Sequence, residues 1–265
     1  MSTVSHVPAQ PAPRRTPSAS PRLALLAAGG VAAAAAVATA GLVDGVGEHG
    51  DLSAYDPTVT ADAVRLRTPV LTVLAEVVTM VGSEVAVGLL TAAVVAWLVL
   101  RRRDRLRALH FGVTMAVSAA LTLGVKHLVA RGRPPAAVVL GPVDTGYSFP
   151  SGHTLFSTVF FGLVALLVAD RLAGRRGGRG LAVLGWVLAS LVVGASRVYL
   201  GYHWFTDVAA GWVLGVLVLA LAVAGLAPLR HRGGVALPTL AGGRGRQRSA
   251  AADDVEGVAD ARPAR

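Results

Sequence analysis

The sequence predicts an all-α protein, a six-transmembrane-helix bundle whose polar site lies at the extracytoplasmic end. Three observations predict this fold. Of the 265 residues, 54% are hydrophobic and only 15% are charged, and the mean hydropathy is +0.60, an apolar balance that ordinary water-soluble domains do not have. Apolar runs long enough to cross roughly 30 Å of hydrocarbon recur along the chain. Arginine-rich and acidic segments alternate between those runs.

Six apolar runs of about 17 to 25 residues are the expected spans, because a helix of that length crosses the hydrocarbon. They cover residues 22–43, 84–100, 107–128, 153–170, 180–197 and 205–227. The first run is rich in Ala and Gly and contains Ala38-Thr39-Ala40, a small-residue pattern typical of a signal-peptidase site. Its apolar stretch is longer than a signal peptide needs. We therefore interpret it as an uncleaved span, and cleavage would leave the topology of the later spans unchanged.

Arginine clusters define the predicted topology. One cluster separates the second and third runs and another separates the fourth and fifth: Arg101, Arg102, Arg103, Arg105 and Arg107, then Arg171, Arg175, Arg176 and Arg179. The positive-inside rule places both clusters in the cytoplasm, together with both termini. The net charge of +10 therefore indicates a multi-pass orientation in the plasma membrane and contact of the cytoplasmic face with anionic lipid headgroups, rather than binding of nucleic acid.

The segments outside the runs differ in composition. Residues 57–83 are apolar but interrupted by charge, and we expect a helix on the outer surface that leads into the second span. Residues 1–20 and 229–265 lack apolar periodicity and are predicted to be disordered cytoplasmic tails. These tails flank a membrane domain at residues 21–228. The absence of cysteine excludes disulfides, thiolate catalysis and thiolate metal sites.

Ionisable side chains gather at the outer ends of the last four predicted spans. They are Lys126, Arg131, Arg133, His153, Arg197, His203 and Asp207. Ionisable groups at membrane depth are costly and mark candidate functional sites. Lys126 is the only lysine in the sequence, and its compact ammonium suits a phosphate oxygen. Arg133 follows Lys126 seven positions later, just before two prolines that end the helix. Taken alone, this Lys–Arg pair has an alternative interpretation, in which Lys126 binds no phosphate and only extends its ammonium to the membrane interface.

Two further clusters point to an anion. Pro150-Ser151-Gly152-His153 leads into the fourth span, and a helix N-terminus with bare N–H groups binds anions. The alternative is a plain Ser cap beside an incidental histidine. His203 and Asp207 are four residues apart, so on a helix they share a face. A carboxylate bonded to one imidazole nitrogen leaves the other nitrogen free to attack. Alone this pair also fits a structural role, but together the three clusters favour an anion-processing site.

The three clusters resemble the signature motifs of one known family. Lys126-x6-Arg133-Pro134, Pro150-Ser151-Gly152-His153 and Ser196-Arg197-x5-His203-x3-Asp207 are similar to the three motifs of the type 2 phosphatidic acid phosphatase superfamily. The resemblance covers roughly residues 107–228. The superfamily is similar at its active site to class A acid phosphatases and vanadium haloperoxidases. The six predicted spans resemble its bacterial branch of integral-membrane lipid phosphatases.

The resemblance implies an enzyme without metal or cofactor, a phosphoric monoester or diphosphate hydrolase that acts on a lipid phosphate through a phosphohistidine. It implies that His203 is the nucleophile, that Asp207 orients it, and that His153 exchanges protons with the leaving group and with water. The phosphoryl oxygens would be held by Lys126, Arg133, Ser151, Gly152 and Arg197, with added positive field from Arg131. Candidate substrates are phosphatidic acid, phosphatidylglycerophosphate and polyprenyl diphosphates such as the undecaprenyl carrier, which reach a headgroup-level site from within the bilayer.

Two other functions stay open at this point. A phosphotransferase would use the same phosphohistidine with an alcohol as the acceptor. A transporter or channel would carry charged residues through the depth of several spans, whereas the middle of the predicted bundle is nearly free of them. Nearby aromatic residues are interpreted as an interfacial belt: Tyr147, Tyr199, Tyr202 and Trp204. Glu84 is assigned no role.

Overall fold

The computed structural model describes residues 21–47, 52–172, 175 and 177–233, and within these ranges every regular element is a helix. The helices are α1 Pro21–Gly47, α2 Asp56–Arg65, α3 Pro69–Val81, α4 Glu84–Leu100, α5 Arg105–Val129, α6 Gly152–Arg171, α7 Gly178–Tyr199 and α8 Phe205–Gly233, with 3-10 turns at Ser53–Tyr55 and Ala136–Val138. The predicted all-α fold is thus confirmed. The predicted N-terminal tail lies outside the described residues, and so does most of the C-terminal one, of which residues 229–233 instead continue α8.

The helices of the described chain account for the predicted spans with one correction. Five of them, α1, α5, α6, α7 and α8, are long and apolar enough to cross a membrane. The run at residues 84–100 forms α4, which has only 17 residues and meets this standard together with α3, as a pair bent by 48°. The break lies at Gly82 and Ser83. The hydroxyl of Ser83 accepts a hydrogen bond from the N–H of Ala86 at 3.2 Å, which caps α4 as a new helix.

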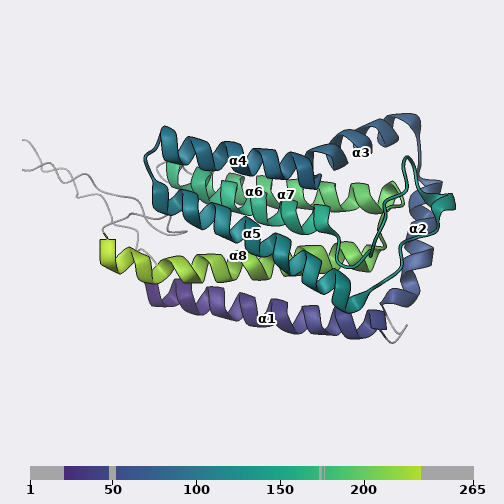
Figure 1. Cartoon of the computed structure of the whole chain (residues 1–265), viewed down its shortest axis with the longest axis horizontal. Helices are drawn as coiled ribbons and strands as arrows, with labels where there is room; N and C mark the ends of the chain where they lie inside the picture. The colour runs from purple at the N-terminus through teal and green to yellow at the C-terminus, as the bar shows by residue number, and fades with distance from the viewer. Residues whose placement is uncertain (1–20, 48–51, 173–174, 176, 234–265) are drawn as a thin grey trace, which may run out of the picture.

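The segment predicted as one outer-surface helix, residues 57–83, forms two helices instead. α2 ends at Arg65, and α3 starts at Pro69. Thr68 caps α3, since its hydroxyl accepts a hydrogen bond from the N–H of Leu71 at 3.3 Å. A proline at the first helical position costs no hydrogen bond, because its N–H would be unpaired there in any case. As a result α2 crosses one end of the bundle, while α3 leads back toward α4 (Figure 1).

The core of the bundle is built around α6, which packs against α4, α5, α7 and α8. Leu155 is fully buried there, and Phe160 meets Phe111 of α5 edge to face at 5.7 Å between ring centroids. A Cβ added at Gly211 of α8 would lie 2.8 Å from the Cβ of Thr154. Glycine is therefore what lets α8 approach α6 so closely, as small residues do between membrane helices. α1 packs along the outer flank of α8 (Figure 1).

The loops that follow α5 and α7 meet at one end of the bundle, beside α2 (Figure 1). The N–H of Leu140 donates to the carbonyl oxygen of Leu200 at 2.9 Å. Gly201 has a φ of +81°, and a Cβ there would lie 2.2 Å from the carbonyl oxygen of Val138. Only glycine fits this left-handed, crowded position. The described chain begins and ends at the opposite end of the bundle, so the two loops are held together far from both ends (Figure 1).

Candidate active site

A buried histidine–aspartate pair lies at this loop end of the bundle. The side chains of His203 and Asp207 are 2% and 0% exposed, and His203 Nδ1 is 3.2 Å from Asp207 Oδ2. The N–H of Trp204 donates to the same carboxylate oxygen at 3.0 Å. The pair does not share a helical face, because His203 lies in the turn before α8, which begins at Phe205. Asp207 reaches back from the first turn, as an acidic residue does in a capping box.

This geometry leaves one imidazole nitrogen of His203 available for chemistry. An Nδ1–H that donates to the carboxylate leaves Nε2 with its lone pair. Burial lowers the pKa of His203 to about 4, although the hydrogen bond and the charge of Asp207 act in the opposite direction. The imidazole is therefore neutral at neutral pH, and the Nε2 lone pair is lost to protonation only as the pH falls toward that value. A nearby carboxylate then stabilises the positive charge that the ring gains when it bonds to an electrophile.

Two arginines from different parts of the chain converge on one carboxylate. Arg197 at the end of α7 has a side chain 4% exposed, and its Nη2 donates to Asp144 Oδ2 at 2.7 Å. Arg133 donates from Nη1 to the same oxygen at 3.4 Å and to the carbonyl oxygen of Tyr202 at 3.0 Å. Arg197 also lies over the ring of Tyr202, 4.1 Å from its centroid. Tyr202, expected in an interfacial belt, is instead buried beneath the cations.

Lys126 and His153 belong to the same cluster. The Lys126 ammonium donates to the carbonyl oxygen of Tyr147 at 2.6 Å. Its charged neighbours are Arg133, Asp207, Glu84 and Asp144. The charged or titratable neighbours of His153, in the first turn of α6, are Arg197, His203, Arg133 and Lys126. The structure thus brings all the predicted cations except Arg131 to one place beside the two histidines.

The start of α6 contributes backbone to this place. Ser151 is fully buried, its N–H donates to the carbonyl oxygen of Asp207 at 3.0 Å, and its hydroxyl accepts a hydrogen bond from Thr154 at 3.0 Å. The hydroxyl proton of Ser151 is left to donate to an anion. A Cβ at Gly152 would lie 2.8 Å from Glu84 Oε1. Glu84, which the sequence left without a role, therefore lies against the N-terminus of α6.

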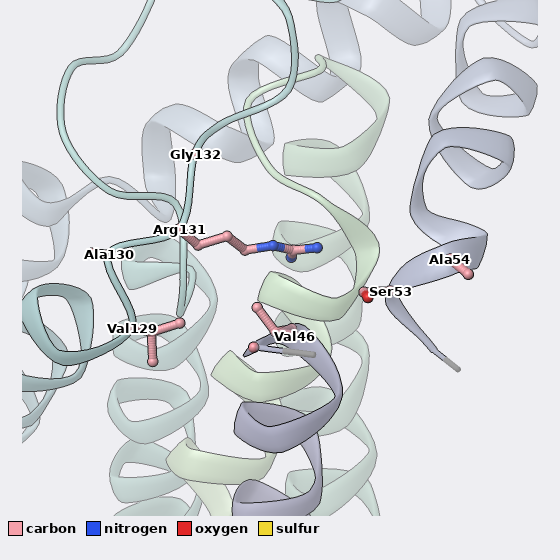
Figure 2. A pocket seen from close by; sticks show the side chains of 8 residues that line it. Val46, Ser53, Ala54, Val129, Ala130, Arg131 and Gly132 are labelled. Carbon is pink, nitrogen blue, oxygen red and sulfur yellow. The ribbon is translucent and has the colours of Figure 1, made fainter. Parts of the chain in front are cut away.

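Arg131 lies behind the pair rather than among the other cations. Its Nη1 donates to Asp207 Oδ1 at 2.5 Å and to the hydroxyl of Thr206 at 2.8 Å, and its Nη2 donates to Asp56 Oδ2 at 2.7 Å. We expected Arg131 to add positive field at the phosphate. In the structure its guanidinium instead contacts two carboxylates. Arg131 also borders a cavity of about 450 Å³ that none of the other predicted site residues lines (Figure 2).

Two acidic residues of the site, Asp144 and Asp56, were not predicted from the sequence. Asp144 carried one signal, since it is the only acidic residue between Asp104 and Asp170 and falls among the motif cations. Its carboxylate lies between two arginines, as a phosphate oxygen would. Asp56 carried no local signal, because its partners are distant in the chain. Within the described ranges, no group of three or more His, Asp or Glu side chains is placed to hold a metal.

Replacing Asp144 by asparagine tests whether this carboxylate competes with an anion. The variant is expected to bind orthovanadate, a phosphate mimic, about 2- to 5-fold more tightly, because a partly exposed ion pair is worth little and its loss frees both arginines. Binding is measured as the inhibition constant for vanadate. Asp62→Asn serves as a control at an exposed carboxylate of α2. Weaker vanadate binding by Asp144→Asn would show that Asp144 holds the arginines in place rather than competing with the anion.

Fold and site together define a multi-pass helical membrane protein with a cluster of cations and histidines at one end of its bundle. Residues 107–229 match the sequence profile of the PAP2 superfamily, and the chain is 34% identical to a decaprenylphosphoryl-5-phosphoribose phosphatase of Mycobacterium tuberculosis over 52% of this chain and 71% of that protein. The chain belongs to the PAP2 superfamily. This confirms the family that the three motifs predicted.

Other relatives agree with this membership. The chain is 36% identical to an undecaprenyl-diphosphatase of Sulfolobus acidocaldarius over 49% of this chain, a match that spans only 60% of that protein. It is 27% identical to phosphatidylglycerophosphatase B of Bacillus subtilis over 63% of this chain and 80% of that protein. Among solved structures, a transmembrane PAP2-type phosphatidylglycerolphosphate phosphatase from B. subtilis shares the fold, with a TM-score of 0.66 at 23% identity over 72% of this chain and 93% of that chain.

Proposed function

We propose that the protein hydrolyses a lipid phosphate or diphosphate through a phosphohistidine formed on His203. One observation carries the proposal: the buried pair of His203 and Asp207 lies in the same cluster as Lys126, Arg133 and Arg197. A neutral imidazole with an oriented lone pair is a nucleophile. Cations held by the fold stabilise the charge on a phosphoryl group during its transfer. The phosphatase names of the relatives support the hydrolysis itself.

In the first step, Nε2 of His203 attacks phosphorus and the bond from phosphorus to the leaving oxygen breaks. Arg133, Arg197 and Lys126 balance the charge on the three non-bridging oxygens of the phosphoryl group that is transferred. The Ser151 hydroxyl and the N–H of Gly152 at the start of α6 add hydrogen bonds to those oxygens. His153 gives a proton to the leaving oxygen, which departs as an alcohol or, from a diphosphate, as a monophosphate.

In the second step, water attacks the phosphohistidine. His153, which is now neutral, takes a proton from the water as the bond between phosphorus and Nε2 breaks. Free phosphate leaves, and His203 returns to its neutral form. Asp207 stabilises the positive imidazole ring between the two steps. The alternative phosphotransferase differs only in the acceptor, since an alcohol would replace water in this step.

A lipid substrate fits the surroundings of the site. On α5, Leu123 and Leu128 flank Lys126 and are 60% and 80% exposed. An apolar outer face beside the lone ammonium lets an acyl or prenyl chain stay in the bilayer while its phosphate enters the site. The positive-inside rule orients this end toward the extracytoplasmic side, with both termini in the cytoplasm. An outward-facing site favours the recycling of a carrier lipid such as undecaprenyl diphosphate.

A substrate panel tests the proposed function. The purified full-length protein in detergent is given phosphatidic acid, phosphatidylglycerophosphate or undecaprenyl diphosphate, and free phosphate is measured. We expect release from at least one of these without any added acceptor. Release that requires an added alcohol would favour the phosphotransferase instead. Release from none of the three, by protein that is folded and monodisperse, would overturn the proposal.

Replacing Lys126 by alanine is expected to raise the KM for the lipid phosphate about 10- to 100-fold, because a charge-assisted contact to a phosphate oxygen is lost. The measurement is the dependence of phosphate release on substrate concentration in mixed micelles. Arg105→Ala, at the other end of α5, is the matched control and should leave the KM unchanged. An unchanged KM for the Lys126 variant would remove the ammonium from the phosphate site.

Removal of divalent metal is expected to leave the rate of phosphate release unchanged. The proposed mechanism uses arginine and lysine where a metal would otherwise stabilise the phosphoryl charge. The rate is measured after dialysis against EDTA, and again after magnesium or manganese is added back. A rate that falls on dialysis and returns with metal would contradict the mechanism.

A further inference from the structure

Asp56 is a buried carboxylate that lies outside the segment matched by the family profile. It is the first residue of α2 and is 1% exposed. Its Oδ1 accepts a hydrogen bond from the N–H of Thr206 at 3.0 Å, and its Oδ2 accepts from the hydroxyl of Thr206 at 2.5 Å. Oδ2 also accepts from Nη2 of Arg131 at 2.7 Å. A carboxylate is buried at such a cost only when it is paired and hydrogen-bonded, and here its partners come from the start of α8 and the loop after α5.

Arg131 joins Asp56 to the proposed nucleophile. One guanidinium nitrogen binds Asp56, and the other binds Asp207 Oδ1. The other oxygen of Asp207 faces His203. Figure 2 shows the Arg131 side chain reaching from its loop toward the side on which Ser53 lies, just before α2. The four side chains therefore form one continuous chain of charge-assisted hydrogen bonds from α2 to the imidazole.

The charges along this chain balance only when Asp56 is included. With His203 neutral, Arg131 supplies one positive charge against the two carboxylates. When His203 becomes positive on phosphorylation, the sum is zero. Without Asp56, the guanidinium would neutralise Asp207 by itself, and no net negative charge would remain for the imidazole.

We propose that Asp56 is a positioning residue for the nucleophile: it holds and neutralises Arg131 so that Asp207 keeps its orientation and its charge for His203. The inference rests on the proposed function, because it needs His203 to become positive during turnover. It adds an element, α2, that precedes the residues of the three signature motifs.

The experiment measures phosphate release by the full-length protein in detergent, with the lipid phosphate that the unaltered protein hydrolyses. Asp56→Asn keeps the shape of the side chain and removes its charge. It is expected to lower kcat about 10- to 100-fold, the size seen when an outer hydrogen-bonding partner of a site is lost, with little change in KM. Asp62→Asn, on the same helix but exposed, should match the unaltered protein. Asp56→Glu, which keeps the charge, should retain more activity than Asp56→Asn.

The pH profile separates this role from a merely structural one. Besides Asp207, the groups around His203 are Arg197 from α7, Arg133 from the loop after α5 and His153 from α6. Removing a negative charge lowers the pKa of His203, so the acid limb of kcat/KM should move to lower pH in Asp56→Asn. Arg131→Gln should move it to higher pH. The double variant, in which the charge sum is restored, should return toward the original profile.

The outcomes are distinguishable. If the unaltered protein releases no phosphate, the proposed function fails. If it releases phosphate but Asp56→Asn behaves as Asp62→Asn does, the positioning role fails. If Asp56→Asn does not elute as a folded protein on size exclusion, the comparison of Arg131→Gln with the double variant decides. A double variant whose acid limb stays with that of Arg131→Gln would overturn the inference.

Discussion

Replacing His203 by alanine is expected to abolish phosphate release, with a loss of about 10⁴-fold or more, the scale on which removal of a nucleophile acts. The reason is structural, since His203 is the imidazole that Asp207 holds beside three cations in the described part of the chain. The measurement has two parts. Phosphate release from the lipid is followed over time, and the protein is incubated with ³²P-labelled substrate and examined for an acid-labile covalent phosphate. Neither signal is expected from His203→Ala.

The matched control is His127→Ala. His127 lies at the same end of α5, is exposed, and meets Tyr147 edge to face at 5.6 Å. It should keep both the activity and the labelling of the unaltered protein. Vanadate binding to His203→Ala would show that the cation site is still formed. Labelled phosphoprotein in His203→Ala would move the nucleophile elsewhere and would contradict the assignment.

The spans could be predicted because membrane insertion imposes a local rule on sequence. Each apolar run has to satisfy its own backbone within the hydrocarbon, so length and hydropathy alone reveal it. The break between α3 and α4 could not be predicted from length and hydropathy. Residues 70–81 are apolar but too few to cross the membrane alone. Whether they join the next helix depends on the bend at Gly82, where an added Cβ would lie 2.4 Å from Val193 of α7. That contact belongs to the tertiary structure.

The residues of the site also divide into those that local motifs predict and those that depend on tertiary contacts. Lys126, His153 and His203 were predictable because they fall in short motifs whose spacing is fixed by a helix end or a turn. Asp56 was not predictable, because it bonds to Thr206 across 150 positions of the chain and no sequence pattern near either residue indicates the contact. Arg131 was predicted to add positive field beside the first-motif cations, and the structure pairs it with Asp56 and Asp207. Neighbours in sequence, such as Arg131 and Arg133, can point to opposite sides of one loop, and only the three-dimensional structure separates them.

Replacing His153 by alanine is the second change with a large expected effect, a loss of about 10²- to 10⁴-fold in phosphate release from a lipid phosphate whose leaving group is an alcohol, the range of general acid–base catalysis. The size should depend on the leaving group. An alkoxide needs a proton from His153 to depart, whereas p-nitrophenolate leaves without one. With p-nitrophenyl phosphate the first step therefore stays fast while the second step, which needs a base for water, is slow. His153→Ala is then expected to release a burst of p-nitrophenol and to accumulate the ³²P-labelled phosphohistidine that His203→Ala cannot form.

His110→Ala is the control for this prediction, because His110 lies near the other end of α5, where its Nε2 is 3.2 Å from the carbonyl oxygen of Ala222. It should show neither the loss nor the burst. A His153 variant that is equally slow with both leaving groups and forms no labelled protein would place His153 in phosphate binding rather than in proton transfer. A burst with the activated substrate would assign His153 to the proton and His203 to the phosphorus, since only separate groups for the two tasks allow the first step to survive the loss of the acid.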